Sequence, residues 1–394
     1  MKILVLTSFY SPEKGAAPHR ITSMCDELKK KGHDLSVITP LANYPKGRFF
    51  KPYRRKIYYT DIINDIKVTR YWFLPSNSNS KLSRGLSLIT SFFGAFITSF
   101  YHLLIHSKFD LIIIQTPPLT SAYGYSLACK LFCKKYILNV SDLWPSTAVD
   151  LGVIAKGSIS WNIFSFIEKS LYIYSISLIA QSNETTKYLR NCTDKKVHLF
   201  RNLTKANNFT KSSFDNNNRI KIIYAGLLGN AQDLLSLCKK IDWSKLNVEL
   251  HVFGEGVQKE QIISLQNDCI HYHKPISKKE IQKEIQKYDF SLVPLRVNIF
   301  GAFPSKITAT ISSGVPVLFI GEGEGYDIVK RLGIGKSFRN VEVSKMSDFL
   351  KMYSTNRLDY VKYFNEKINL SLEGEFNYQN NINELNKFIT QLNR

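Results

Sequence analysis

The sequence predicts an α/β protein built from two doubly wound halves, each with a parallel sheet between layers of helices. The chain has 394 residues, more than one hydrophobic core usually serves. Short, continuous apolar runs alternate with stretches of helical periodicity, which is typical of parallel strands covered on both faces. A polar segment at 204–219, rich in Asn, Ser and Thr, interrupts this alternation and is expected to be a linker.

The first half begins with the apolar run KILVLTSF, followed by a Gly/Pro-containing loop and a helical pattern that ends at Gly32. Further apolar runs and helical stretches follow in the same order. The expected strands are 2–9, 34–40, 110–116, 136–142 and 177–182, and the expected helices are 20–31, 119–134 and 183–191.

The second half repeats the alternation after the linker. Its expected strands are 221–226, 248–254, 269–273, 290–295 and 315–320, and its expected helices are 231–241, 256–266, 277–287 and about 305–313. The halves are therefore expected to be Rossmann-like domains whose sheets face a cleft. Ligands of such sheets bind at the carboxyl ends of the strands, so the residues just after each strand carry the functional information.

The charge is strongly basic, with 53 Lys and Arg against 32 Asp and Glu, a net charge of +21. Such an excess favours a polyanionic partner: nucleic acid, an anionic membrane or a phosphorylated substrate. Nucleic-acid binding would call for cations interleaved with aromatic residues on one face, whereas the cations here are scattered among ordinary helices. We therefore expect no nucleic-acid partner.

Residues 85–105 contain no Asp, Glu, Lys or Arg and are long enough to span a bilayer as a helix. Three alternatives are open: a spanning helix, a buried domain helix, and an interfacial helix that enters one leaflet. The basic flanks Lys81, Arg84, His106 and Lys108 suit the interfacial helix. No signal peptide precedes the first strand, so we expect a cytoplasmic protein.

No metal site or cofactor is expected. The six cysteines form no C-x-x-C pair, which indicates reduced thiols. His271 and His273 would share one face of a strand, but no third ligand is expected near them.

Two loops of the first half are candidates for function. Gly15, in the loop SPEKGAAPHR, lies near a helix start, where backbone N–H groups can bind an anion; a plain connecting loop is the alternative. Asp142, in SDLWPS, follows an apolar strand and is expected to face the cleft beside the rigid pair Trp144 and Pro145. Alternatively, Asp142 caps the next segment.

Three segments of the second half could hold phosphate. AGLLGNAQD places Gly226, Gly229 and Asn230 after a strand, and FGEG places Gly254 and Gly256 after another, where a ligand can approach the backbone closely.

The third segment is Pro304-Ser305-Lys306. Ser305 is expected to cap a helix and Lys306 to lie in its first turn, where a cation opposes the helix dipole unless an anion binds there. A solvated lysine is the alternative. Without a G-x-G-x-x-G fingerprint, these segments indicate a nucleotide-diphosphate donor.

Several longer stretches together resemble the family 4 retaining glycosyltransferases of GT-B fold. They are SPEKGAAPHR with KKGHDLSVIT and NYPKGR, VSDLWPSTAVDLGVI, IIYAGLLGNAQDLL and FPSKITATISSGVPVLFIGEGEG. The branch that they resemble most adds N-acetylated amino sugars such as L-fucosamine during bacterial O-antigen or capsule synthesis. The resemblance covers nearly the whole chain.

The resemblance implies an N-terminal domain, 1–203, that binds the acceptor and a C-terminal domain, 220–374, that binds the nucleotide sugar. A final helix within 375–394 would return to the first domain. The implied catalytic residues are Asp142 and Lys306, with Lys306 on the donor diphosphate. The other implied donor-binding residues are Gly226, Gly229, Asn230, Gln232, Gly254, Gly256, Lys274, Pro275, Pro304 and Ser305. Glu13, Gly15, Arg20 and Trp144 would lie on the acceptor side.

The sequence departs from the family at two places. Leu227 and Ala231-Gln232 stand where the broader family has a phosphate-binding Arg and Lys, and Ala309 stands where a glutamate usually holds the ribose. The implied activity is transfer of a sugar from a UDP-sugar to a lipid-diphosphate-linked glycan at the inner membrane face, with an anionic membrane surface as partner and no metal. The alternative is a non-catalytic or weakened subunit of a membrane glycan assembly complex.

Overall fold

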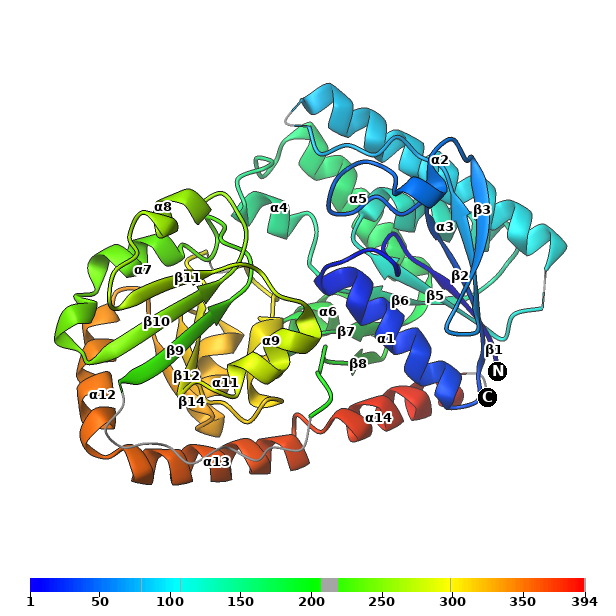
Figure 1. Ribbon diagram of the computed structural model, residues 1–394. Coiled ribbons are helices and arrows are strands. Elements are labelled where there is room, and N and C mark those ends of the chain that lie inside the picture. Colours follow the sequence, from blue (N-terminus) through cyan, green and yellow to red (C-terminus); the bar gives the residue numbers. More distant parts are fainter. Residues whose placement is uncertain (79, 107, 207–218, 298, 393–394) are drawn as a thin grey trace. The chain divides into compact units, whose positions relative to one another are not determined.

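The computed structural model describes residues 1–78, 80–106, 108–206, 219–297 and 299–392, and the chain divides into two compact units (Figure 1). Unit 1 contains Met1–Arg201, Phe300–Ala302 and Ile382–Arg394, and unit 2 contains Asn202–Ile299 and Phe303–Asn381. Most of the linker expected at 204–219 lies outside the described residues.

Unit 1 holds an eight-stranded sheet in the order β3-β4-β2-β1-β5-β6-β7-β8, parallel except for the β3–β4 hairpin. Continuous burial of β5 and β6 on both faces confirms the expectation of a covered parallel sheet. The strands are β1 (Lys2–Leu6), β2 (Asp34–Pro40), β3 (Tyr58–Ile63), β4 (Ile66–Tyr71), β5 (Leu111–Thr116), β6 (Tyr136–Val140), β7 (Ser175–Ala180) and β8 (Val197–Leu199). The helices are α1 (Ala16–Lys30), the short η1 (Lys51–Tyr53), α2 (Lys81–Ile105), α3 (Leu119–Leu131), α4 (Ser146–Asp150), α5 (Ile159–Tyr174) and α6 (Asn183–Cys192).

Helix α2 packs along α3, and glycine makes this close contact possible: a Cβ on Gly124 would lie 2.5 Å from the carbonyl oxygen of Phe92. Among the described residues, α2 alone is long and apolar enough to cross a membrane, and only 28% of its most apolar window is buried. The alternative of a helix buried in the domain is therefore wrong. One side of α2 packs into unit 1, and the other presents apolar side chains to the outside.

Unit 2 holds a six-stranded parallel sheet in the order β11-β10-β9-β12-β13-β14. Its strands are β9 (Ile220–Ala225), β10 (Val248–Phe253), β11 (Ile270–His273), β12 (Phe290–Pro294), β13 (Val317–Ile320) and β14 (Gly335–Phe338). Its helices are α7 (Leu234–Lys240), the short η2 (Trp243–Lys245), α8 (Lys259–Ile263), α9 (Lys278–Ile285), α10 (Ser305–Ile311), α11 (Glu324–Leu332), α12 (Val343–Thr355) and α13 (Arg357–Glu373).

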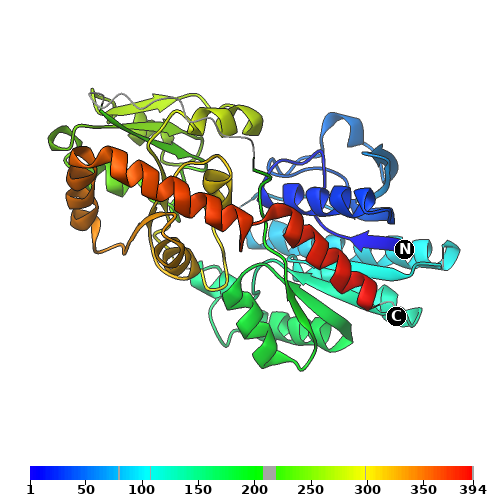
Figure 2. The same ribbon diagram turned by 90° about the horizontal axis from the view of Figure 1, so that it is seen from below.

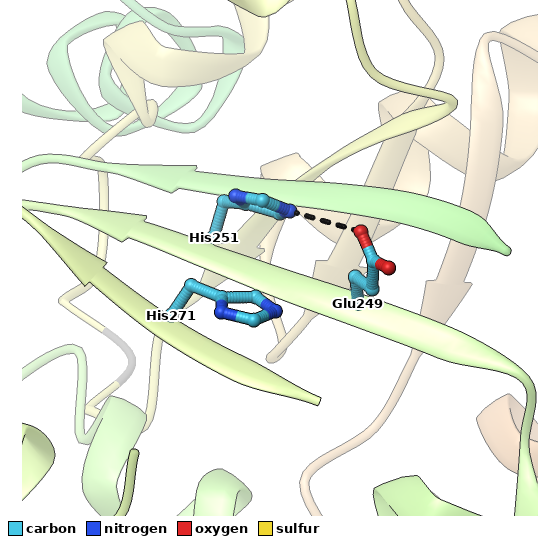
Figure 3. Close-up of side chains that lie close together, drawn as sticks. All are labelled: Glu249, His251 and His271. Atoms are coloured by element: carbon cyan, nitrogen blue, oxygen red, sulfur yellow. Dashed lines mark hydrogen bonds and ion pairs between the residues drawn. The ribbon is translucent and has the colours of Figure 1, made fainter. Parts of the chain in front are cut away.

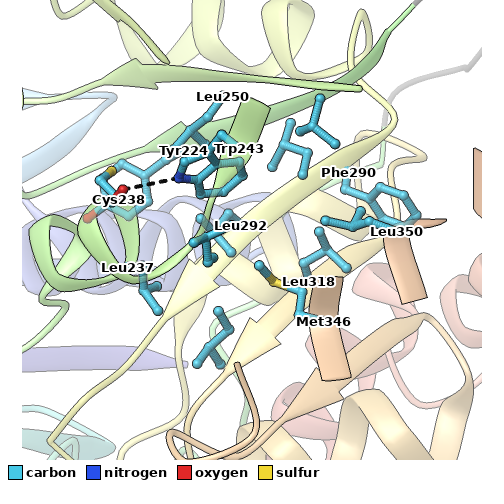
Figure 4. Close-up of a cluster of buried hydrophobic side chains, with 14 of the residues drawn as sticks. Tyr224, Leu237, Cys238, Trp243, Leu250, Phe290, Leu292, Leu318, Met346 and Leu350 are labelled. Atoms are coloured by element: carbon cyan, nitrogen blue, oxygen red, sulfur yellow. Dashed lines mark hydrogen bonds between the residues drawn. The ribbon is translucent and has the colours of Figure 1, made fainter. Parts of the chain in front are cut away.

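The main core of unit 2 lies between this sheet and the helices that follow it (Figure 4). Leu250, Phe290 and Leu318 reach it from three strands, and Leu350 closes it from α12. The indole N–H of Trp243 is satisfied by the carbonyl of Cys238, at 3.3 Å. The core fixes the carboxyl ends of the strands, where the candidate donor residues lie.

The last helix, α14 (Tyr378–Gln391), packs its final turns against unit 1. The side-chain oxygen of Asn386 lies 2.6 Å from Nε2 of His33, and Phe388 stacks on His198. The end of α14 consequently lies near the start of β1 (Figure 1 and Figure 2).

Candidate functional site

Lys306 is the second residue of α10, as expected. The cap before it differs from the prediction: Pro304 occupies the N-cap without a side-chain hydrogen bond, and Ser305 is the first helical residue. Ser305 therefore does not cap the helix. The N-cap position before it falls on a proline, which offers no side-chain oxygen.

The Lys306 ammonium lies 4.0 Å from the centroid of the Tyr224 ring. Its Nζ is buried and has no hydrogen-bond partner among the described residues. Burial lowers the pKa of Lys306 to about 7, because the charged form loses its hydration. The alternative of a solvated lysine is therefore wrong. An anion bound beside the ammonium would offset the free-energy cost of burying this charge.

The glycines after β9 and β10 let two loops pack backbone against backbone. A Cβ on Gly226 would lie 2.4 Å from Nζ of Lys306, and one on Gly254 would lie 2.2 Å from the Gly226 carbonyl oxygen. A Cβ on Gly256 would likewise lie 2.3 Å from the Leu228 carbonyl oxygen. Gly226 thus leaves room for the Lys306 ammonium beside the end of β9, and Gly254 and Gly256 let the two loops approach, a reason that the sequence alone did not reveal.

The loop continues from Gly229 to Asp233. The Gln232 side-chain oxygen is buried without a hydrogen-bond partner among the described residues, whereas Asp233 accepts from Arg296 at 2.5 Å and from Gln258 at 3.0 Å. Gln232, Asp233 and Arg296 line a pocket of about 280 Å³ at the carboxyl edge of the sheet. These bonds lower the pKa of Asp233 in spite of its partial burial.

Arg296 was missed in the sequence, although it lies two residues after β12, where functional residues are expected. It supplies a cation beside the loop in which the broader family carries its Arg and Lys. Ala309 lies three residues after Lys306 on α10 and hence on the same helix face, so no carboxylate is offered at that position. Lys274 and Pro275 are exposed after β11.

In unit 1, the Glu13 carboxylate is buried and bound by the backbone. It accepts from the N–H groups of Asn43 at 2.8 Å, Tyr44 at 2.9 Å and Tyr10 at 3.3 Å. Burial raises its pKa and these bonds oppose the shift. Glu13 therefore fixes the loop after β1 against the loop after β2, and Gly15 completes the contact, because a Cβ there would lie 2.7 Å from the Tyr44 ring.

Arg20 and Asp142 are charged residues of opposite sign at the same edge of the unit 1 sheet. The Arg20 guanidinium donates to the hydroxyl of Ser141, the residue before Asp142, and its Nε has no partner among the described residues. Burial lowers the pKa of Arg20 to about 10, and the charge of Asp142 opposes this shift. Burial likewise raises the pKa of Asp142, and Arg20 lowers it.

Asp142 does not cap the helix that follows it, because the N-cap of α4 is Pro145, without a side-chain bond. The capping alternative is therefore wrong. Trp144 packs edge-on against Phe164 of α5, at 6.1 Å between ring centroids. The loop after β6 thus presents one carboxylate beside a fixed aromatic wall.

A histidine cluster lies on one face of β10 and β11 (Figure 3). The parallel register places His251 opposite His271, and ligand atoms of Glu249, His251 and His271 lie within 4.8 Å of one another. The expectation that no third ligand lies near the histidine pair is therefore wrong. His251 is hydrogen-bonded through Nδ1 to His273 at 2.9 Å and through Nε2 to Glu249 at 3.4 Å, so the structure accounts for its placement without an ion.

Comparison with known proteins finds sequence relatives that are assigned as glycosyltransferases, while no protein-family model matches the chain. WcaI of Escherichia coli (strain K12), assigned as a colanic acid biosynthesis glycosyl transferase, is 25% identical over 290 residues, 66% of this chain and 68% of WcaI. WbjE of Pseudomonas aeruginosa, assigned as a glycosyltransferase, is 24% identical over 357 residues, 85% of this chain and 84% of WbjE.

Solved structures share the fold at low sequence identity. Sucrose-phosphate synthase from Thermosynechococcus elongatus aligns with a TM-score of 0.74 at 12% identity, over 100% of this chain and 99% of that one. Anabaena HepE in complex with UDP aligns with a TM-score of 0.66 at 12% identity, over 99% of this chain and 100% of that one. The chain accordingly has the GT-B fold of these solved structures, and both sequence relatives are assigned as glycosyltransferases.

Proposed function

We propose that the protein is a retaining glycosyltransferase that moves a sugar from a UDP-sugar to a lipid-diphosphate-linked glycan. The observation that carries the proposal is Lys306: a buried ammonium without a hydrogen-bond partner among the described residues, at the carboxyl edge of unit 2 beside Gly226. A donor diphosphate supplies the missing negative charge. The UDP complex of HepE, which shares the fold, favours uridine as the base.

In the proposed reaction, the bond between the sugar C1 and the β-phosphate oxygen breaks, and a bond from C1 to an acceptor hydroxyl oxygen forms on the same face. The hydroxyl proton passes to the departing phosphate. Lys306 stabilises the charge that develops on this phosphate. We expect this electrostatic stabilisation to be the protein's largest single contribution to lowering the activation barrier. Asp142 orients the acceptor beside Trp144, and an N-acetylamino sugar is the proposed sugar.

The second candidate is a weakened or non-catalytic subunit of a glycan assembly complex. Ala309 is the observation that favours it, because no carboxylate stands at this position of α10 to hold the ribose hydroxyls. Loss of a charged, bidentate acceptor costs a few kcal/mol of binding, about 1.5–3 per bond. Donor affinity distinguishes the two candidates.

Calorimetric titration of UDP into the wild type and a Lys306→Met variant tests the proposal. Methionine keeps the packing against Tyr224 and removes the charge. We expect binding by the wild type and at least tenfold weaker binding by the variant, about 1.4 kcal/mol. Lys239→Met, at an exposed lysine of α7, is the control and should bind as the wild type does. Wild-type protein that does not bind UDP would support the subunit role instead.

We further propose that the protein docks on an anionic membrane at the inner face of the cell membrane through α2. Leu82, Ile89, Ile97 and Leu104 are each more than half exposed on this helix. Between 46 and 108 the chain carries eleven Lys and Arg against two Asp, Asp61 and Asp65. An apolar helix face with basic surroundings suits insertion into one anionic leaflet. Because the opposite side of α2 packs on α3, the proposal is interfacial docking and not spanning.

Charged substitutions on the exposed face should weaken docking. We expect the double variant Ile89→Asp, Leu104→Asp to bind phosphatidylglycerol vesicles at least tenfold more weakly in a flotation assay, since two apolar side chains no longer enter the leaflet. Leu358→Asp, at a 60% exposed position of α13, is the matched control. Wild-type binding should weaken as salt rises. Wild-type protein that ignores these vesicles at low salt would refute the docking surface.

A further inference from the structure

An open apolar groove of about 690 Å³ lies in unit 1 between α2 and the β3–β4 hairpin. Its walls are large apolar side chains that are substantially exposed: Ile57 and Tyr58 at the start of β3, Trp72 after β4, and Phe93, Ile97 and Tyr101 on α2. The volume lies within the range of about 300–1,000 Å³ typical of ligand pockets. A groove of this volume with apolar walls suits an apolar ligand.

The floor of the groove is firmly built. A Cβ on Gly94 would lie 2.6 Å from the Tyr71 ring and 2.7 Å from the Trp72 carbonyl oxygen, so only glycine lets the end of β4 approach α2 this closely. The Tyr71 hydroxyl bonds to that of Tyr125 at 2.8 Å, and Tyr125 donates to the Thr7 carbonyl at the end of β1. The groove is therefore preformed.

The charges around the groove select the kind of ligand. Arg54, Arg55 and Lys56 directly precede Ile57, and Lys81 and Arg84 lie in the first turn of α2. Neither acidic residue between 46 and 108, Asp61 nor Asp65, lines the groove. An apolar channel beside basic residues suits a ligand with a hydrocarbon chain and an anionic head.

The groove adjoins the acceptor side of unit 1. Trp72 follows the carboxyl end of β4, the sheet edge at which Glu13 and Gly15 also lie. Asn77, in the segment between β4 and α2, donates to the Pro45 carbonyl, and the neighbouring Tyr44 packs on Gly15. A lipid whose hydrocarbon chain lies in the groove would thus have its phosphate near the carboxyl edge of the unit 1 sheet.

We propose that this groove binds the hydrocarbon chain of the lipid phosphate that carries the glycan acceptor. The proposal rests on the proposed transferase function. It goes beyond membrane docking, because it assigns a defined groove to the hydrocarbon chain of one lipid. Bulk membrane lipid is the competing occupant, since it shares the chemistry of a chain and a phosphate. Trp72 provides a reporter within the groove, and farnesyl phosphate is a suitable probe.

The test is titration of farnesyl phosphate below its aggregation limit, followed by tryptophan fluorescence, with Trp72→Phe to assign the signal. We expect a saturable change that inorganic phosphate does not produce. Thr98→Phe fills the groove without adding charge and should weaken binding at least tenfold. Leu131→Phe, at an exposed position of α3 outside the groove, should bind as the wild type does.

Two outcomes would overturn the proposal: no saturable response of Trp72, or equal binding by Thr98→Phe and the wild type. Equal binding of dihexanoyl phosphatidylglycerol would assign the groove to bulk lipid and likewise overturn it. UDP titration of the same variants separates the two sites. Farnesyl phosphate binding without UDP binding would refute the transferase function but not the lipid site in the groove. UDP binding without farnesyl phosphate binding would refute the lipid site alone.

Discussion

UDP should bind about 50-fold more weakly at pH 9 than at pH 7. The diphosphate requires Lys306 in its charged form, and burial lowers the pKa of this lysine to about 7. At pH 7 about half of the free protein is charged at Lys306, and at pH 9 about 1% is. The phosphates of UDP are ionised throughout this range, since their last pKa is about 6.

The Lys306→Met variant is the control for this pH dependence. It should show weak binding that is flat between pH 7 and pH 9, because the titrating group is absent. The variant should also fold at least as stably as the wild type. The folded-state pKa lies below the unfolded value of 10.5, so the buried charge opposes folding most strongly below pH 7, and this cost disappears as the pH rises through 10.5. An equal pH dependence in both proteins would assign it to another group.

Replacement of Asp289 by alanine should lower the free energy of unfolding of unit 2 by about 3–5 kcal/mol. Asp289 and Arg357 are almost completely buried, at 2% and 8% exposure. The carboxylate accepts from Arg357 Nη2 at 2.8 Å, from the Tyr353 hydroxyl at 3.0 Å and from the Lys221 N–H at 2.9 Å. Alanine leaves a buried guanidinium without its counter-charge.

Urea unfolding followed through Trp243, which lies in the core of unit 2, measures this loss. The double variant Asp289→Leu, Arg357→Met should recover most of it, because no unpaired charge then remains. Glu375→Ala breaks the more exposed ion pair with Arg331, at 2.6 Å, and should cost less than about 1 kcal/mol. A loss below 1 kcal/mol for Asp289→Ala would show that water reaches Arg357.

The sequence was sufficient to predict the strands that are buried on both faces of the sheets. The run 34–40 coincides with β2, and 136–142 contains β6, because continuous apolar residues mark covered parallel strands. The β3–β4 hairpin was missed. Its first strand alternates exposed and half-buried residues, and its turn at Asn64 and Asp65 offers a weaker signal than an apolar run.

The candidate site was predictable where it follows a strand and not where it depends on register. Lys306 could be recognised from its motif, but its burial depends on Gly226, which lies 80 residues earlier in the chain. His251 and His271 are neighbours only because β10 and β11 pair in parallel. Arg296 could have been found, since it lies two residues after an apolar strand.

The most direct test of the central claim, that Lys306 binds the donor diphosphate, is the number of protons taken up when UDP binds at pH 8. It is obtained by calorimetry in buffers of different ionisation enthalpy. Since about nine-tenths of Lys306 is neutral at this pH and becomes charged in the complex, we predict uptake of about 0.9 protons per UDP by the wild type and none by Lys306→Met. UDP binding by the wild type without proton uptake would contradict the account.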